Sequence, residues 1–185
     1  MSPEDFERLI APVQVSMTRC VWRIVRDETE TEDVVQEVLL QVWRQFDRVQ
    51  AHPNPSAYLL RLSAHRALDH LRRRRARLST LDRLGEVPRE ASSDPRQQLS
   101  RDEHRRQIVA FLANLPPREA EAIALHALED LNPDEIATAM GCRPATVRVL
   151  ISRARQRFRE AFPELRTAPA ETDTLPDAPE LPAES

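Results

Sequence analysis

Residues 115–160 contain the pattern that decides the fold: LPPREAEAIALHALEDLNPDEIATAMGCRPATVRVLISRARQRFRE. Asn132 is a good cap for a helix that has Pro133 at its first position, and Gly141 supplies the left-handed residue that ends it. A second helix begins at Pro144, and its apolar side chains keep helical spacing at Val147, Leu150, Ile151 and Ala154. The stretch therefore predicts two helices joined by a tight turn.

The spacing of Ala137, Gly141 and Val147 is typical of a helix-turn-helix. A small residue lets the helices cross closely, glycine makes the turn, and a branched side chain fills the angle between them. The second helix also carries a set of arginines, whose guanidinium groups suit phosphate and guanine: Arg143, Arg148, Arg153, Arg155, Arg157 and Arg159. The pattern favours DNA binding over its alternative, a solvated charged helix that only packs on a bundle.

The composition predicts an all-α protein. Of the 185 residues, 31% are charged, 4% are aromatic and only 2 are glycine, and few runs alternate with the period of a strand. No apolar run approaches the roughly 18 residues of a membrane span, so we expect no membrane insertion. The two cysteines, Cys20 and Cys142, lie far apart without metal-ligand spacing and are interpreted as buried thiols in a reducing compartment.

Residues 3–27 are expected to form a helix broken near Pro12, and residues 29–46 a regular amphipathic helix. The second helix has a broad apolar stripe that includes Trp43. Its other face carries six mainly polar residues, Asp33, Gln36, Glu37, Leu40, Gln41 and Arg44. Leu40 is either ordinary surface or the apolar centre of a partner-binding patch, and the pattern alone leaves both readings open.

After a loop at 47–54, Asn54 caps a long helix that begins at Pro55 and is expected to end near Arg77. Its inward positions are apolar, whereas eight residues are expected to lie largely outward: Tyr58, Arg61, His65, Arg66, Asp69, His70, Arg72 and Arg73. Arginines interleaved with an aromatic ring and histidines are typical of a surface for single-stranded nucleic acid. The alternative is a solvated helix end whose arginines only complement the helix dipole.

Residues 78–100 are rich in linker residues and predict a flexible tether, followed by an amphipathic helix over 101–113. The overall charge of −3 conceals a segregated distribution, because the segment 163–185 holds six acidic residues and one arginine. That segment, rich in proline and alanine, is expected to be disordered. We hypothesise that it weakly screens the basic helices; an inert solubilising tail is the alternative.

Three blocks in this order resemble the extracytoplasmic-function (ECF) subfamily of sigma-70 factors of bacterial RNA polymerase. They are TEDVVQEVLLQVWRQFDR at 31–48, AYLLRLSAHRALDHLRRRR at 57–75, and the stretch 115–160. The resemblance implies a region 2-like domain at 1–77, the flexible linker at 78–100, a region 4-like helix-turn-helix domain at 101–162, and an additional tail at 163–185. It also implies a protein that binds core polymerase, directs it to −35 and −10 promoter elements, and helps to melt the DNA.

The resemblance assigns roles to the candidate residues. The six-residue face of 29–46 would dock on the coiled coil of the β′ clamp, and the eight outward residues of 57–75 would capture the −10 strand. The helix from Pro144 would recognise the −35 element through Arg143, Ala145, Thr146, Arg148, Val149, Ser152, Arg153 and Arg155. The chain departs from the family at three −10 positions, Tyr58, His65 and Arg66, where the family commonly has Trp, Asn and an apolar residue.

As partners the resemblance implies core RNA polymerase, contacted at the β′ clamp and the β flap, promoter DNA, and an anti-sigma factor, all in the cytoplasm. A free-standing DNA-binding regulator would explain residues 115–160 but leaves the basic helix at 57–75 without a task. An enzyme is the weakest alternative, because the sequence has no glycine-rich phosphate loop, no clustered metal ligands and no nucleophile–base spacing. No cofactor and no metal are therefore expected.

Overall fold

The computed structural model describes residues 2–83 and 98–163, with side chains described for 2–80 and 106–163. These residues form helices and no strand, which confirms the all-α prediction. The helices are α1 (Pro3–Ile10), α2 (Gln14–Val25), α3 (Glu28–Arg44), α4 (Phe46–Gln50), α5 (Pro55–Arg83), α6 (Gln98–Asn114), α7 (Pro117–Leu128), α8 (Pro133–Met140) and α9 (Pro144–Ala161).

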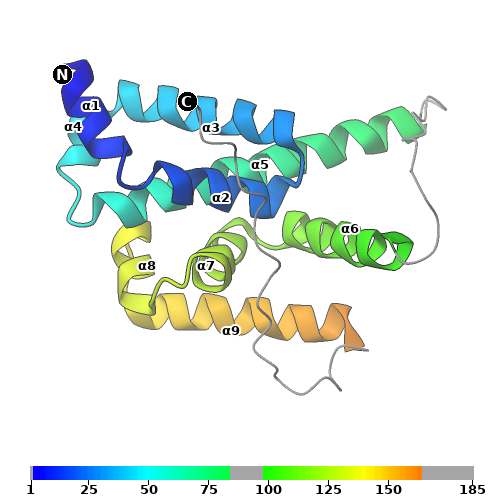
Figure 1. The fold of residues 1–185 in the computed structure, drawn as a ribbon. Coiled ribbons are helices and arrows are strands. Elements are labelled where there is room, and N and C mark those ends of the chain that lie inside the picture. Colours follow the sequence, from blue (N-terminus) through cyan, green and yellow to red (C-terminus); the bar gives the residue numbers. More distant parts are fainter. Residues whose placement is uncertain (1, 84–97, 164–185) are drawn as a thin grey trace.

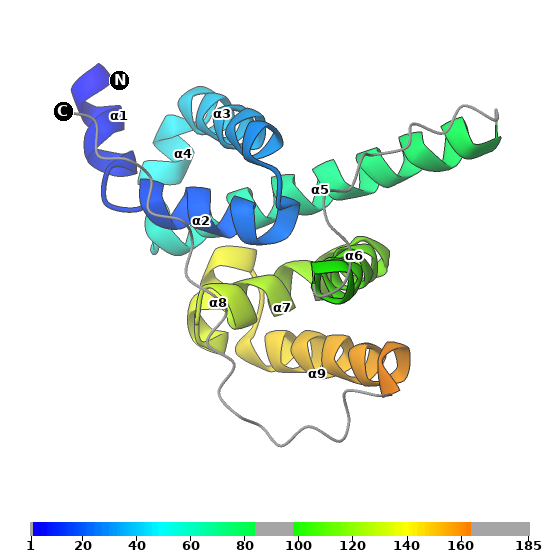
Figure 2. The same cartoon turned by 45° about the vertical axis from the view of Figure 1, so that its right-hand side comes forward.

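The helices form two groups that pack on one another through α5. Helices α1–α4 lie on one side of α5 and α6–α8 on the other, with α9 outermost beneath α7 and α8 (Figure 1). The turned view shows the same order, and the last turns of α5 extend beyond α2 and α3 (Figure 2). Because α5 has neighbours on both sides, it is the centre of the molecule.

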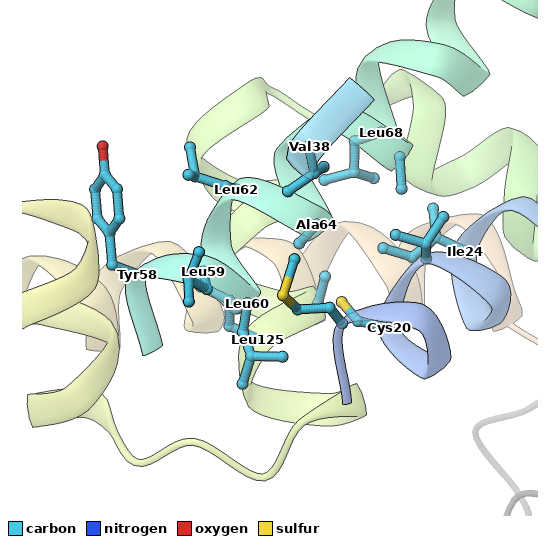
Figure 3. Packing of buried hydrophobic residues seen from close by; sticks show 14 of the residues in the cluster. Cys20, Ile24, Val38, Tyr58, Leu59, Leu60, Leu62, Ala64, Leu68 and Leu125 are labelled. Carbon is cyan, nitrogen blue, oxygen red and sulfur yellow. The ribbon is translucent and has the colours of Figure 1, made fainter. Parts of the chain in front are cut away.

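One contiguous hydrophobic cluster runs through both groups of helices. It joins Val38 of α3 and Ile24 of α2 to Leu59 and Leu60 of α5, and continues to Leu125 of α7 (Figure 3). All five side chains are buried. Between residues 57 and 71, α5 carries buried apolar side chains on more than one side, which explains why it packs against α7 and α8 as well as α2 and α3.

Most helix boundaries follow local signals in the sequence. Pro12 separates α1 from α2 as expected, and the Asn54 side chain accepts a 3.0 Å hydrogen bond from the Ala57 amide at the start of α5. Two boundaries differ. Residues 46–50 form the short helix α4, although the loop was expected to begin at residue 47, and Phe46 and Val49 of this helix are buried. Helix α5 continues to Arg83, beyond the expected end near Arg77.

The chain between α5 and α6, residues 84–97, and the tail from 164 onward lie outside the described residues. Helix α6 begins at Gln98, three residues earlier than expected, so the ends of the expected tether belong to helices on both sides. The flexible linker and the disordered tail therefore remain predictions.

The helix-turn-helix has the expected local structure. Asn132 and Glu135 form a reciprocal capping box at the start of α8, with the Asn132 side chain accepting bonds from two amides. Gly141 has φ 62° and ends that helix in the left-handed conformation. Ala137 and Val147 are both buried, at the crossing of α8 and α9. The turn that presents α9 is thus built by the residues that predicted it.

Candidate partner and nucleic-acid interfaces

The face of α3 predicted to dock a partner lies largely on the surface. Asp33, Gln36, Glu37, Leu40 and Arg44 are exposed, and Leu40 is 56% exposed although it is a large apolar side chain. Gln41 is half-buried, because its side-chain oxygen accepts a 2.8 Å hydrogen bond from Arg66 Nε. The result is an apolar centre surrounded by polar groups, a common anatomy for a docking surface.

Trp43 was expected on the buried stripe of α3, but it is 46% exposed. Its ring contacts Phe6 of α1 edge-on, with 5.1 Å between the ring centres. Only one edge of the ring is therefore covered by α1. Trp43 lies three residues after Leu40, so the two side chains are neighbours on the surface of α3. Trp43 therefore extends the exposed apolar surface of α3, although the stripe pattern had assigned it to the core.

The face of α9 predicted to contact DNA is open to solvent. All eight candidates are exposed, and these are Arg143, Ala145, Thr146, Arg148, Val149, Ser152, Arg153 and Arg155. Val147, Ile151 and Ala154 on the opposite face are buried against region 115–140 and fix the orientation of the helix. Val149 is 48% exposed on the arginine-bearing side, where it is available for an apolar contact.

The eight candidates on α5 do not lie outward as predicted. Tyr58 is only 8% exposed and packs against the His52 ring, with 4.6 Å between ring centres. Among the other seven, only Arg73 is exposed. The remaining six are half-buried, and they are Arg61, His65, Arg66, Asp69, His70 and Arg72. The expectation failed because a periodic pattern on one helix does not reveal which other segments cover its polar face, here the loop at His52, helix α3 and the C-terminal helices.

Three of the α5 candidates bind helix α3. Arg66 donates to Gln41, His70 faces the Glu30 carboxylate at 3.1 Å, and Arg73 lies 3.7 Å from Glu37. Arg66 and Arg73 therefore connect the candidate strand-binding residues to the candidate docking face of α3. A partner that engages Gln41 or Glu37 would compete for these arginines.

The other group of α5 candidates binds the C-terminal helices. The Glu121 carboxylate of α7 accepts from Arg61 Nε at 3.1 Å and lies 2.6 Å from His65 Nδ1. Arg72 Nη2 donates to the Leu115 carbonyl at 3.4 Å and, through Nη1, to Asp69 at 3.0 Å. The basic side chains that were predicted to bind a nucleic-acid strand thus contact oxygen atoms of the protein itself.

Glu121 and His65 shift each other's titration. Burial alone would raise the pKa of Glu121, but the hydrogen bond from His65 and the charge of Arg61 hold that pKa below its usual value. The hydrogen bond to Glu121 raises the pKa of His65, with burial opposing it and the charge of Asp69 assisting. Both shifts favour the ion pair.

A second buried acid lies where α7 meets α2. Arg23 of α2 donates to the Leu128 carbonyl and lies 3.8 Å from the Glu129 carboxylate. Burial raises the pKa of Glu129 to about 7 although Arg23 opposes the shift, and the same burial raises the pKa of the neighbouring Cys20 thiol. Neither Glu121 nor Glu129 was predicted as an interface residue. The available signal was the presence of acids in a largely apolar helix opposite a basic one.

Within the described ranges, no group of three or more histidine, cysteine or acidic side chains could hold a metal ion. In the same ranges, no helix is both long enough and apolar enough to cross a membrane. Cys20 is buried and Cys142 half-buried, and both are free thiols. The candidate sites named from the sequence are a polar face with an apolar centre on α3 and two arginine-rich helices, α5 and α9.

A helix-turn-helix whose second helix is exposed and rich in arginine is typical of the class of DNA-binding transcription factors. Comparison with known families makes this specific. The family model of Sigma-70 region 2 matches residues 9–77, and that of Sigma-70 region 4 matches residues 105–158. Together they cover about two thirds of the chain.

Relatives along nearly the whole chain agree. The RNA polymerase sigma-E factor of Streptomyces avermitilis is 27% identical over 158 residues, 84% of each chain. The RNA polymerase sigma-H factor of Pseudomonas aeruginosa is 28% identical over 172 residues, 88% of this chain and 89% of that one. The ECF sigma factor SigE of Mycolicibacterium smegmatis is 31% identical over 144 residues, 77% of this chain and 55% of that one.

Solved structures share the fold. The sigma factor RpoE in complex with the anti-sigma factor NepR, from Bartonella quintana, superposes with a TM-score of 0.54 at 23% identity, covering 86% of this chain and 98% of that one. CnrH in complex with the cytosolic domain of CnrY gives 0.53 at 20% identity, covering 88% and 89%. The chain belongs to the sigma-70 family of RNA polymerase sigma factors, in its ECF subfamily. It is a sigma factor, which directs core RNA polymerase to promoters.

Proposed function

We propose that three helices divide the work of this sigma factor: α3 docks on core polymerase, α9 recognises the −35 element, and α5 holds the −10 strand. The observation that carries the proposal is the helix-turn-helix, whose second helix exposes all eight candidate residues while its apolar face is fixed in the core. Each role uses the residues named from the sequence.

The α3 face fits a protein partner. Burying Leu40 removes apolar surface from water, while Asp33, Glu37 and Arg44 around it supply charges that fix the orientation of the partner. The β′ clamp of core polymerase would be that partner, and the β flap would contact the C-terminal domain. An additional polar contact by Gln36 and Gln41 fits the same face.

The α9 face fits the major groove. An α-helix enters this groove, where an arginine fork pairs with the two acceptors of guanine and an exposed valine contacts a thymine methyl group. Arg148 and Arg153 are the main candidates for base contacts, and Val149 lies between them in sequence. Arg143, Arg155 and the shorter Ala145, Thr146 and Ser152 would contact phosphates or allow close approach.

The α5 face fits a melted strand once it is uncovered. Extruding a base costs a few kcal/mol, which arginine contacts with the backbone and stacking on Tyr58 would offset. In this role the basic residues Arg61, His65, Arg66, His70, Arg72 and Arg73 would exchange their protein partners for phosphates, and Asp69 would orient Arg72.

We further place the chain in the cytoplasm, where it would act without catalysing a reaction of its own, since polymerase performs the chemistry. An anti-sigma factor is the expected regulator, and one structure with the same fold is that of RpoE in complex with the anti-sigma factor NepR. The roles proposed for α3, α5 and α9 involve neither Cys20 nor Cys142.

The test is run-off transcription from fragmented genomic DNA with purified core polymerase and this protein. The proposal predicts discrete start sites that share two spaced motifs. Leu40→Asp should abolish core binding, whereas Val15→Asp, which charges another exposed apolar residue, on α2, should leave it unchanged. Sequence-specific DNA binding without any core binding would instead identify a free-standing regulator.

A further inference from the structure

Part of the surface of α5 proposed to hold the −10 strand is covered by the C-terminal helices of the same chain. Helices α7 and α8 pack directly on α5, and Leu125 of α7 is buried in the cluster that contains Leu59 and Leu60 (Figure 3). Three of the eight strand-binding candidates, Arg61, His65 and Arg72, donate to or face oxygen atoms of the C-terminal group.

The Glu121 carboxylate is the acceptor at the centre of this contact. Its side chain is only 5% exposed, and each of its two oxygens faces a different basic side chain of α5. Oε2 lies 3.1 Å from Arg61 Nε, and Oε1 lies 2.6 Å from His65 Nδ1. A carboxylate held between an arginine and a histidine offers the same hydrogen-bond acceptors and the same sign of charge as a backbone phosphate. Glu121 thus occupies the groups that a phosphate would need.

The ring of His65 is held on both sides. Its Nδ1 faces Glu121, and its Nε2 lies 3.2 Å from Asp69 of the same helix. Neutral imidazole has only one N–H donor, so both contacts are satisfied as hydrogen bonds only by the protonated ring. A charged His65 strengthens the attachment of α7 to α5.

Two further contacts close the same interface. Arg61 Nη1 donates to the Ala139 carbonyl at 3.3 Å, so one arginine binds both α7 and α8. On the other side of α7, Arg23 of α2 donates to the Leu128 carbonyl. Arg23 is outside the candidate strand-binding set, so it provides a way to weaken the interface without altering that set.

We propose that the C-terminal helices act as an intramolecular competitor of the −10 strand, with the Glu121 carboxylate in the place of a phosphate, so that the free chain binds single-stranded DNA only after α7 leaves α5. This inference rests on the proposed role of α5. Closure and strand binding are mutually exclusive because both use Arg61, His65 and Arg72.

The test compares the full-length wild-type chain with Glu121→Gln and Arg23→Gln. The probe is a fluorescent pool of random-sequence single-stranded 20-nucleotide DNA at low salt, with circular dichroism confirming that each variant retains its helices. We expect both variants to bind the pool at least about tenfold more tightly than wild type, because each loses a contact that holds α7 in place. Small-angle scattering should show a larger radius of gyration for both.

The matched control is Glu119→Gln. Glu119 lies on the same helix and is also buried, and its carboxylate accepts a 3.0 Å hydrogen bond from an arginine, but that arginine is Arg157 of α9. This pair is internal to the C-terminal group, so the control should bind the pool as wild type does. An equal gain in the control would overturn the proposal, because general loosening of α7 would then explain the effect.

The remaining outcomes separate the two ideas. If wild type and both variants bind the pool equally tightly, α5 is accessible in the free chain, which overturns the competitor and leaves the role of α5 intact. If the variants expand in scattering but none of the proteins binds the pool, with or without core polymerase, the role of α5 fails and the competitor fails with it.

Discussion

Helices α9 and α5 are both rich in arginine and both matched to DNA, yet their side chains have opposite environments. On α9 every candidate is exposed, and the arginines need no rearrangement to reach a duplex. On α5 each candidate has a partner inside the protein, from His52 to Glu121. If α9 and α5 have the roles proposed for them, duplex DNA can be recognised without rearrangement, whereas melted DNA requires a change of conformation.

The difference has a simple physical origin. Helix α9 is amphipathic, so one side satisfies the core and the other remains free. Helix α5 is apolar on several sides between residues 57 and 71, and the additional apolar surface attracts a second layer of helices. The charges of α5 then find partners in that layer, because a half-buried arginine without one would carry a desolvation cost.

The largest effect is expected from Arg148→Ala combined with Arg153→Ala. If both guanidinium groups pair with bases, each loss should weaken −35 duplex binding by about 1–3 kcal/mol, without affecting folding because both side chains are exposed. Anisotropy titration with a promoter duplex found by run-off transcription measures it. Arg106→Ala, which removes one exposed arginine on α6, controls for the loss of a positive charge outside α9 and is compared with each single variant. Unchanged duplex affinity in the double variant would contradict the proposal that α9 binds the duplex through Arg148 and Arg153.

A second effect is the response of the covered helix to pH. The hydrogen bond to Glu121 raises the pKa of His65, with the charge of Asp69 assisting and burial and the charge of Arg61 opposing. His65 therefore stabilises the closed form fully below its unpaired pKa, and this contribution is lost as pH rises through its folded pKa. Burial, assisted by the charge of Asp130, raises the pKa of Glu129 to about 7, and the charge of Arg23, the hydrogen bond from Cys20 and the charge of Arg19 oppose the shift, so deprotonation as pH rises also weakens closure. Both groups therefore favour the open form above about pH 7.

Small-angle scattering at about pH 6 and about pH 8 checks this, since DNA affinity would confound closure with the charge of His65 itself. Glu121 acts in the opposite sense, but with its lowered pKa it protonates below this window. We expect a compact chain at the lower pH and a larger radius of gyration at the higher one. In the combined variant His65→Gln and Glu129→Gln the size should no longer depend on pH, and a persisting dependence would point to other groups.

A smaller effect is expected at the turn that presents α9. Gly141 has φ 62°, and a Cβ added there would meet no atom within 4 Å, so Gly141→Ala tests backbone strain alone. We expect a loss of about 1–2 kcal/mol in the free energy of unfolding, and less for Gly141→Asn, which tolerates the left-handed region better. Urea unfolding provides the measurement. Equal costs for alanine and asparagine would show that strain at φ is not the cause.

The smallest effect concerns the start of α9. Arg143 occupies the cap position but makes no side-chain capping hydrogen bond, whereas Asn132 caps α8 fully. Arg143→Ser should stabilise the protein by about 0.5–1 kcal/mol and weaken duplex binding, because a cap replaces a cationic side chain at the DNA face. Thermal unfolding and duplex titration of one sample measure both. A gain in stability with no loss of affinity would exclude Arg143 from the DNA contact.

The two helices also show how far sequence reasoning extends. The boundaries of α8 and the start of α9 were predicted from Asn132, Gly141 and Pro144 because caps and turns are set by neighbours a few residues away. The exposure of α9 followed from its periodicity. Both features are local, so one window of sequence contains all the information that they need.

The burial of α5 could not be predicted in the same way. Tyr58, Arg61 and His65 are covered by groups 6 to 78 residues away in sequence, and no periodicity on α5 identifies Glu121 or Ala139 as their neighbours. Trp43 was misassigned for a related reason, because the apolar stripe of α3 is wider than the surface that α1 and α5 cover. Family resemblance suggested the roles proposed for these helices but not the arrangement in which they meet.

The central claim, that the C-terminal helices close over α5 in the free chain, is tested most directly by a distance between the two groups. Spin labels would be placed at two exposed positions, Glu32→Cys on α3 and Ala161→Cys on α9, after Cys20→Ala and Cys142→Ser. Pulsed electron paramagnetic resonance should give one narrow distance distribution in the free chain, which lengthens when core polymerase binds. A broad distribution in the free chain that core polymerase leaves unchanged would contradict the claim.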